Sequence, residues 1–210
     1  MNYSIFDVDG TILDSMEIWT TLASRYIQGI GLIPEANLDQ IVSEMSLEQS
    51  AKYLKKQYEI DKSESEIMDE ILNLVSDFYK FEVQLKLGFK DFISNYDSIN
   101  VIGTSSDEKL VEAALKRLDV LSYFEKIITC TQVHKAKSDP DFYLACANVL
   151  NQKPKNVVVF EDAKYCICAA KKAGFQVVGI QDMEDIRSVC DMYIKDWRDL
   201  NEKCINDCGK

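Results

Sequence analysis

Two aspartates, Asp7 and Asp9, flank a single valine at the end of a short apolar run, in the stretch FDVDGTILDS. A buried strand has no use for a pair of carboxylates, so either the strand ends here or the carboxylates do chemistry. Gly10 and Thr11 follow directly, and a glycine lets the chain turn sharply, so that backbone N–H groups can face an anion. The spacing therefore predicts a catalytic or ligand-binding loop directly after the first strand.

Other polar side chains lie at the ends of later predicted strands. Thr104 ends the apolar run INVIGT, Glu161 and Asp162 follow NVVVF, and Lys137 lies in the loop after KIIT. In a parallel α/β sheet the carboxyl ends of the strands meet at one edge, where ligands bind. Each residue alone is better explained as part of a turn, a strand end, a solvated loop or a helix start. Together they predict one shared site.

This set of side chains suits phosphoryl transfer. The carboxylates of Asp7, Asp9 and Asp162 would repel one another unless a cation lies between them, and hard oxygen ligands with few histidines favour Mg²⁺. Lys137 and Thr104 add a positive charge and a hydrogen-bond donor suited to phosphoryl oxygens. We therefore expect an enzyme that uses Mg²⁺ and acts on a phosphate ester.

The elements that must position these groups alternate between strand and helix. Apolar strands are expected at 3–6, 99–104, 126–129, 156–160 and 176–180. The helices between them carry start signals: Ser105 and Glu108 are spaced as a capping box, and Asp139 precedes Pro140 as a cap. Continuous apolar strands separated by helices predict an α/β fold with a parallel sheet covered on both faces.

A helical segment separates the first strand from the rest. Apolar residues recur at helical spacing around Trp19 and again around Ile71, and about four helices are expected there, with Ser46 as a cap of one of them. The expected organisation is a Rossmann-like core of residues 1–14 and 85–210 with an inserted α-helical cap of residues 15–84. The aromatic residues of the cap, Trp19 included, are expected in its own core.

Four motifs in this order resemble the haloacid dehalogenase superfamily of phosphohydrolases. DVDGT at 7–11 is similar to its first motif and Thr104 in VIGTSS to its second; Lys137 in KSDPDFY is similar to its third and VFEDA at 159–163 to its fourth. The insertion between the first two motifs resembles the small α-helical cap of the phosphoglycolate phosphatase-like and β-phosphoglucomutase-like members. Cys166 and Ala163 depart from the fourth motif at positions that concern helix packing.

The resemblance implies a role for each matched residue. Asp7 would be the nucleophile that forms an aspartyl-phosphate, and Asp9 the general acid and base. Thr104, Ser105 and Lys137 would bind the phosphoryl group. The Mg²⁺ would be held by Asp7, Asp9 through its main-chain carbonyl, and Asp162, with Glu161 in support or as a further ligand.

Three functions remain open from the sequence. The first is a Mg²⁺-dependent phosphatase of a small phosphorylated metabolite such as a sugar phosphate or phosphoglycolate. The second is a β-phosphoglucomutase-like mutase, although Trp19 stands where those mutases carry a histidine. The third is a phospho-accepting receiver domain, which is shorter and has neither the insertion nor an acid/base residue such as Asp9.

Composition limits the partners. The net charge of −11, from 35 acidic and 24 basic residues, disfavours the clustered cations that nucleic acids and anionic membranes require. We expect no signal peptide and no membrane span, and hence a cytoplasmic monomer or weak dimer. The seven cysteines are expected to be reduced thiols; Cys204 and Cys208 have no second pair with metal-site spacing, so no structural zinc is expected, and His134 is expected in a surface loop.

Overall fold

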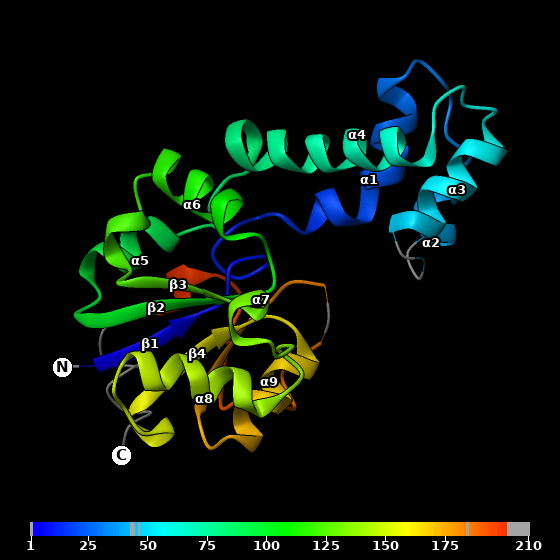
Figure 1. Ribbon diagram of the computed structural model, residues 1–210. Coiled ribbons are helices and arrows are strands. Elements are labelled where there is room, and N and C mark those ends of the chain that lie inside the picture. Colours follow the sequence, from blue (N-terminus) through cyan, green and yellow to red (C-terminus); the bar gives the residue numbers. More distant parts are fainter. Residues whose placement is uncertain (1, 43–44, 46, 184, 201–210) are drawn as a thin grey trace. The chain divides into compact units, whose positions relative to one another are not determined.

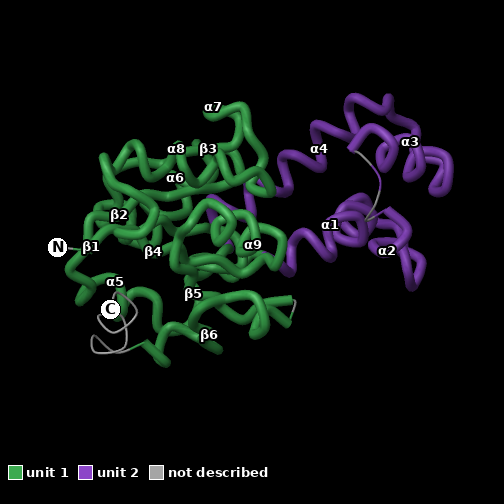
Figure 2. Tube along the Cα trace, turned by 90° about the horizontal axis from the view of Figure 1, so that it is seen from below, with its two compact units in different colours: residues 1–15, 83–210 green, residues 16–82 purple. Residues whose placement is uncertain are grey.

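The computed structural model describes residues 2–42, 45, 47–183 and 185–200. The chain divides into two compact units, Met1–Ser15 with Val83–Lys210 as one and Met16–Glu82 as the other (Figure 2). The boundaries between the units lie after residues 15 and 82. The sequence analysis predicted them after residues 14 and 84. Each unit is described by itself below.

The described residues of the first unit form a six-stranded sheet in the order β3-β2-β1-β4-β5-β6, with all neighbouring pairs parallel (Figure 1). The strands are β1 Asn2–Phe6, β2 Ser98–Thr104, β3 Lys126–Thr129, β4 Val157–Glu161, β5 Gln176–Ile180 and β6 Met192–Ile194. The expected α/β fold with a parallel sheet is confirmed.

The order of the strands creates a switch point at β1. This strand pairs with β2 on one side and with β4 on the other. β3 lies beyond β2, and β5 and β6 lie beyond β4, so the strand order reverses at β1. The register aligns Phe6 with both Ile102 and Phe160, so that the residues following β1, β2 and β4 emerge at the same edge. In open α/β sheets the crevice at such a point is where ligands bind.

Helices cover both faces of the sheet (Figure 1). The helices of this unit are α5 Phe89–Asn95, α6 Glu108–Arg117, α7 Cys130–Val133, α8 Pro140–Val149 and α9 Lys164–Lys172, with 3₁₀ turns η2 Leu121–Tyr123, η3 Pro154–Asn156 and η4 Trp197–Asp199. On one face α8 and α9 pack against Ile5, Val101 and Val159 in a single apolar cluster.

The other face of the sheet carries an aromatic cluster. Phe6 and Phe160 stack with ring centroids 4.4 Å apart, and Trp197 stacks on Phe6 at 5.8 Å. Phe89 of α5 meets the Trp197 ring edge-on at 4.9 Å. Such pairs contribute about 0.5–1.5 kcal/mol each beyond the area they bury. The cluster therefore holds α5 and η4 against this face of the central strands.

Two features of this unit differ from the sequence prediction. The capping box of Ser105 and Glu108 is wrong: the cap of α6 is Asp107, whose carboxylate accepts from the backbone N–H groups of Lys109 and Leu110. The short elements α5, α7 and β6 were not expected, because three- to seven-residue segments are too short for a periodic pattern. The cap of α8 by Asp139, with Pro140 at the first helical position, is confirmed.

The chain segments that lead to and from the second unit lie side by side in the first. Leu13 and Leu85 form an antiparallel bridge, and the N–H of Asp14 donates to the carbonyl of Gln84 at 2.9 Å. Arg117 donates to the carbonyl of Val83. The two chain segments that connect the units are therefore paired with each other within the first unit.

The second unit consists of α1 Met16–Gly29, α2 Leu38–Val42, α3 Leu47–Gln57, α4 Glu64–Asp77 and the π-helical turn η1 Phe78–Glu82. Its core includes Tyr26, Leu54, Ile67 and Ile71. Trp19 is 44% exposed, so its assignment to this core is wrong. The predicted cap at Ser46 lies outside the described residues.

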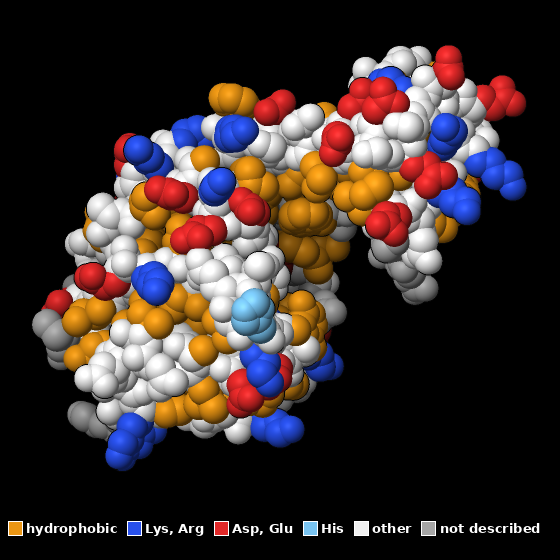
Figure 3. All heavy atoms as spheres, viewed as in Figure 1, with side chains coloured by type: hydrophobic (Ala, Val, Ile, Leu, Met, Phe, Trp, Pro, Cys, Tyr) orange, Lys and Arg blue, Asp and Glu red, His pale blue; other side chains and the backbone are white. Residues whose placement is uncertain are grey.

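On the face seen in Figure 3, acidic and basic side chains are interspersed over both units. His134 is exposed at the end of α7, as expected of a surface residue. Among the described residues, none of the helices combines the length and the apolar character that crossing a bilayer demands.

Candidate active site

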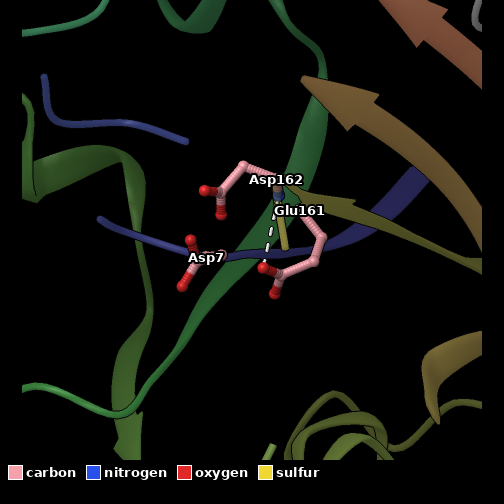
Figure 4. A group of neighbouring side chains, drawn as sticks. All are labelled: Asp7, Glu161 and Asp162. Atoms are coloured by element: carbon pink, nitrogen blue, oxygen red, sulfur yellow. Dashed lines mark hydrogen bonds between the residues drawn. The ribbon is translucent and has the colours of Figure 1, made fainter. Parts of the chain in front are cut away.

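Three carboxylates meet where β1 and β4 end. Asp7 follows β1, Glu161 is the last residue of β4 and Asp162 follows it, and one oxygen of each lies within 4.8 Å of the others. Figure 4 shows the three side chains directed toward a common space. All three are buried, with at most 8% of their surface exposed. A buried group of this kind is costly unless positive charge compensates it.

Lys137 supplies part of that charge. Its ammonium lies 2.5 Å from Oδ1 of Asp7 and 2.5 Å from Oε2 of Glu161, and its own side chain is only 5% exposed. The residue reaches the site from the loop between α7 and α8. Asp139, two residues after Lys137, caps α8 and ends that loop.

The charges of the cluster are unbalanced. Burial raises the pKa of Asp7 to about 6, with Glu161 adding to the effect and Lys137 opposing it. The pKa of Asp162 is raised to about 10, mainly by burial and further by repulsion from Asp7 and Glu161. Burial alone would lower the pKa of Lys137, but Asp7 and Glu161 outweigh it and hold that pKa well above its usual value. One ammonium does not compensate three carboxylates, and the hard oxygen donors fit a divalent cation.

Both oxygens of Glu161 are hydrogen-bonded. Oε2 accepts from the hydroxyl of Tyr143 at 3.1 Å in addition to the ammonium of Lys137. Oε1 accepts from the backbone N–H groups of Asp162 and Ala163, at 3.2 and 3.3 Å, and Figure 4 draws the first of these bonds. Glu161 therefore orients the loop that carries Asp162 as well as Lys137.

Asp9 lies two residues beyond Asp7 and is held by two serine hydroxyls. Ser15 donates to Oδ1 at 2.6 Å and Ser106 donates to Oδ2 at 2.5 Å. A hydroxyl can donate to a carboxylate and accept from a carboxylic acid. These two partners can therefore hold Asp9 in either protonation state, as general acid and base catalysis requires.

The loop after β1 turns back on itself. Gly10 has φ +83°, a conformation that favours glycine, and the N–H groups of Ile12 and Leu13 donate to the carbonyl of Val8. The hydroxyl of Thr11 donates to Oδ1 of Asp162 at 3.4 Å. The turn expected after Asp9 is thus present.

Of the predicted phosphate-binding residues, Thr104 and Ser105 lie at the carboxyl end of β2. The Thr104 hydroxyl is buried and accepts from the backbone N–H of Ser106 at 3.0 Å. The Ser105 side chain is exposed, with its hydroxyl 3.6 Å from Sγ of Cys130. Of the two serines that follow β2, it is therefore Ser106 whose hydroxyl contacts Asp9, and any phosphate contact of Ser105 remains a prediction.

Sequence reasoning missed four residues that contact the site or its loop. Ser15 and Ser106 bond to Asp9, Tyr143 bonds to Glu161, and the indole of Trp197 donates to the carbonyl of Thr11 at 2.9 Å. The two serines lie close to sequence motifs and could have been suspected. The contacts of Tyr143 and Trp197 could not be predicted, because they depend on tertiary packing.

Comparisons with known proteins place the chain in a family. Residues 4–180 match the family model described as haloacid dehalogenase-like hydrolase. A phosphorylated carbohydrates phosphatase of Thermotoga maritima is 27% identical over 180 residues, 84% of this chain and 83% of the relative. A beta-phosphoglucomutase of Bacillus subtilis is 25% identical over 218 residues, 99% of this chain and 95% of the relative.

The fold has close counterparts among solved structures. A crystal structure of a candidate beta-phosphoglucomutase from Thermotoga maritima superposes with a TM-score of 0.81 at 24% identity, covering 93% of this chain and 94% of that one. At this identity the likeness concerns the fold.

Proposed function

The chain belongs to the haloacid dehalogenase-like hydrolase family, and from this premise we propose that it is a Mg²⁺-dependent phosphatase of a small phosphorylated metabolite, of the sugar phosphate or phosphoglycolate type. The reaction is proposed to pass through an aspartyl-phosphate on Asp7. The family and the phosphatase and mutase relatives support phosphate-ester chemistry. The metal, the intermediate and the substrate type are proposed from the residues of the site and from the resemblance of its motifs.

One observation carries the proposal: the ammonium of Lys137 bridges Asp7 and Glu161 inside a buried group of carboxylates. A structural ion pair would need one carboxylate. Three buried carboxylates around one ammonium suit a site that binds further positive charge and stabilises a charged phosphoryl group.

The first step is phosphoryl transfer to the enzyme. An oxygen of Asp7 attacks phosphorus, the bond between phosphorus and the ester oxygen breaks, and Asp9 gives its proton to the departing oxygen. Lys137 and Thr104 hold the phosphoryl oxygens. Ser15 and Ser106 then donate to Asp9, which has become a carboxylate.

The second step releases phosphate. Asp9 takes a proton from water, the water oxygen attacks phosphorus, and the bond to Asp7 breaks, which restores both aspartates and yields inorganic phosphate. Asp7, Asp162 and the main-chain carbonyl of Asp9, with Glu161 in support or as a further ligand, would hold the Mg²⁺, which when bound neutralises charge on the phosphoryl oxygens.

A phosphosugar mutase is the second candidate. The Bacillus subtilis beta-phosphoglucomutase matches nearly the whole chain, which favours it. Trp19 stands where the sequence resemblance places a histidine in mutases, which favours the phosphatase. A mutase would return the phosphoryl group from Asp7 to a second hydroxyl of the substrate.

The cellular setting is part of the proposal. The five cysteines of the described chain are unpaired: Cys130, Cys146, Cys166, Cys168 and Cys190. Free thiols are typical of a reducing compartment, and we propose a cytoplasmic enzyme that acts as a monomer or weak dimer.

The test is phosphate release from sugar phosphates, phosphoglycolate and nucleotides, run beside conversion of β-glucose 1-phosphate to glucose 6-phosphate. We expect hydrolysis of at least one small ester, with none by Asp7→Asn, whose thermal melt stays close to that of the wild type. Conversion without net phosphate release would instead establish the mutase. Wild-type rates in Asp7→Asn would contradict both candidates.

A further inference from the structure

We propose that Tyr143 is a positioning residue of this site: its hydroxyl fixes Glu161 in the orientation in which Glu161 and Asp7 share the ammonium of Lys137. The kinetic part of this inference rests on the proposed function. The binding part does not, because it concerns only how the site holds a phosphate group.

Tyr143 is rigidly placed in α8. The side chain is 1% exposed, and its ring meets Phe142 edge-on at 5.3 Å and Phe175 at 6.2 Å. The helix starts with Asp139 as its cap and Pro140 at its first position, four and three residues before Tyr143. A phenol ring held on several sides has little freedom to redirect its hydroxyl.

The hydroxyl meets Glu161 on the oxygen that matters for Lys137. Oε2 accepts both from Tyr143, at 3.1 Å, and from Lys137, at 2.5 Å. The other oxygen is held by two backbone N–H groups of the loop after β4. Without the phenol, Oε2 would keep only the ammonium of Lys137 as a partner, and the carboxylate could turn about its bonds from the backbone N–H groups at Oε1.

The position of Oε2 matters because Lys137 is shared. The ammonium lies 2.5 Å from both Asp7 and Glu161, so a shift of Glu161 moves the charge relative to Asp7. Charge stabilisation depends on groups held in place before the reaction. A phenol hydroxyl stays protonated at neutral pH, so Tyr143 can donate to Glu161.

The test compares Tyr143→Phe with Tyr96→Phe. The first variant keeps the ring and removes one hydroxyl. The second removes the hydroxyl of Tyr96, which bonds to Ser4 at 2.8 Å from the segment before β2, outside the carboxylate cluster. Each variant loses one hydrogen bond that is at least partly buried. Any general effect of that loss on folding should therefore be similar in the two variants. Thermal melts check that both fold.

Two readouts are measured. For Tyr143→Phe we expect kcat on p-nitrophenyl phosphate to fall about tenfold with KM within about twofold of wild type, because the charge on the transferring group is what Lys137 stabilises. We also expect the Kd of inorganic phosphate, measured by calorimetry with Mg²⁺ present, to rise at least about threefold. Tyr96→Phe should leave both readouts within twofold.

Equal effects of the two variants on kcat and on phosphate binding would overturn the role of Tyr143. If wild type hydrolyses none of the esters, the proposed function fails, while phosphate binding still decides whether Tyr143 organises the site. A rise in Kd confined to Tyr143→Phe supports the inference in either case.

Discussion

The ammonium nitrogen of Lys137 lies 2.5 Å from Oδ1 of Asp7, although 130 residues separate the two in the chain. Neither side chain has more than 6% of its surface exposed. Removing the ammonium leaves the buried carboxylates uncompensated, whereas removing Asp7 leaves Lys137 paired with Glu161. Both the proposed catalysis and the stability of the unit therefore depend on Lys137.

Lys137→Met should abolish phosphate release and lower the free energy of unfolding by about 3–5 kcal/mol, because three buried carboxylates lose their ammonium. Urea unfolding and phosphate release measure the two effects. Lys135→Met is the control: Lys135 is 41% exposed and pairs with Asp139 and Asp141 at the surface, where such pairs contribute about 1 kcal/mol or less. Equal losses in the two variants would count against a special role of Lys137.

Divalent cations should stabilise the protein as well as activate it. The carboxylates of Asp7, Glu161 and Asp162 repel one another, and a bound cation would relieve that repulsion in the folded chain alone. At a free concentration of 100 Kd the gain is about 2.7 kcal/mol, visible as a higher melting temperature. Excess chelator should remove both this gain and the activity. Asp162→Asn should show a smaller gain; an unchanged melting temperature in millimolar Mg²⁺ would refute the cation site.

Ser106→Ala and Ser15→Ala should each lower kcat about tenfold while changing KM little, because the role proposed for Asp9 is to protonate the leaving group in the transition state. Their double variant should lose more than either single one, since each hydroxyl holds a different oxygen of Asp9. Ser94→Ala is the control, because its hydroxyl bonds to the backbone of Asp91 on the exposed side of α5. Steady-state kinetics of all four variants decide the matter, and single variants indistinguishable from Ser94→Ala would dismiss the serine contacts.

Trp197→Phe should destabilise the first unit by about 1–3 kcal/mol. The buried carbonyl of Thr11 loses its indole donor, and a phenyl ring cannot replace it. Urea unfolding followed by circular dichroism measures the loss. Trp19→Phe serves for comparison, since Trp19 is 44% exposed and should change stability by no more than about 0.5 kcal/mol. A loss no larger than this for Trp197→Phe would show that the indole bond does not matter.

The sheet was largely predictable because its strands are short, continuous apolar runs. β2 and β4 were found to within one residue, because most of their residues are apolar and buried. β6, with three residues, has no such pattern. The edge at which Asp7, Lys137, Glu161 and Asp162 meet followed from topology, because parallel strands bring their carboxyl ends together.

The sequence could not show which of two neighbouring side chains makes a given contact. Ser105 and Ser106 are adjacent and chemically identical, and the Thr104 hydroxyl, by accepting from Ser106, sets the turn between them. The start of α6 was misplaced for a similar reason: Ser105 and Asp107 can both cap a helix, and only the backbone path selects Asp107. Side-chain choices among near neighbours depend on angles that spacing does not encode.

The indole of Trp197 reaches back across 186 residues to the loop that follows the first strand. That strand is also central, with one neighbour beginning at Ser98 and the other at Val157. During synthesis the loop that carries Asp7 and Asp9 thus leaves the ribosome long before Lys137, Glu161 and Trp197. Catalytic competence should appear late in translation and abruptly, and nascent chains released before Trp197 should be inactive however much of the sheet they contain.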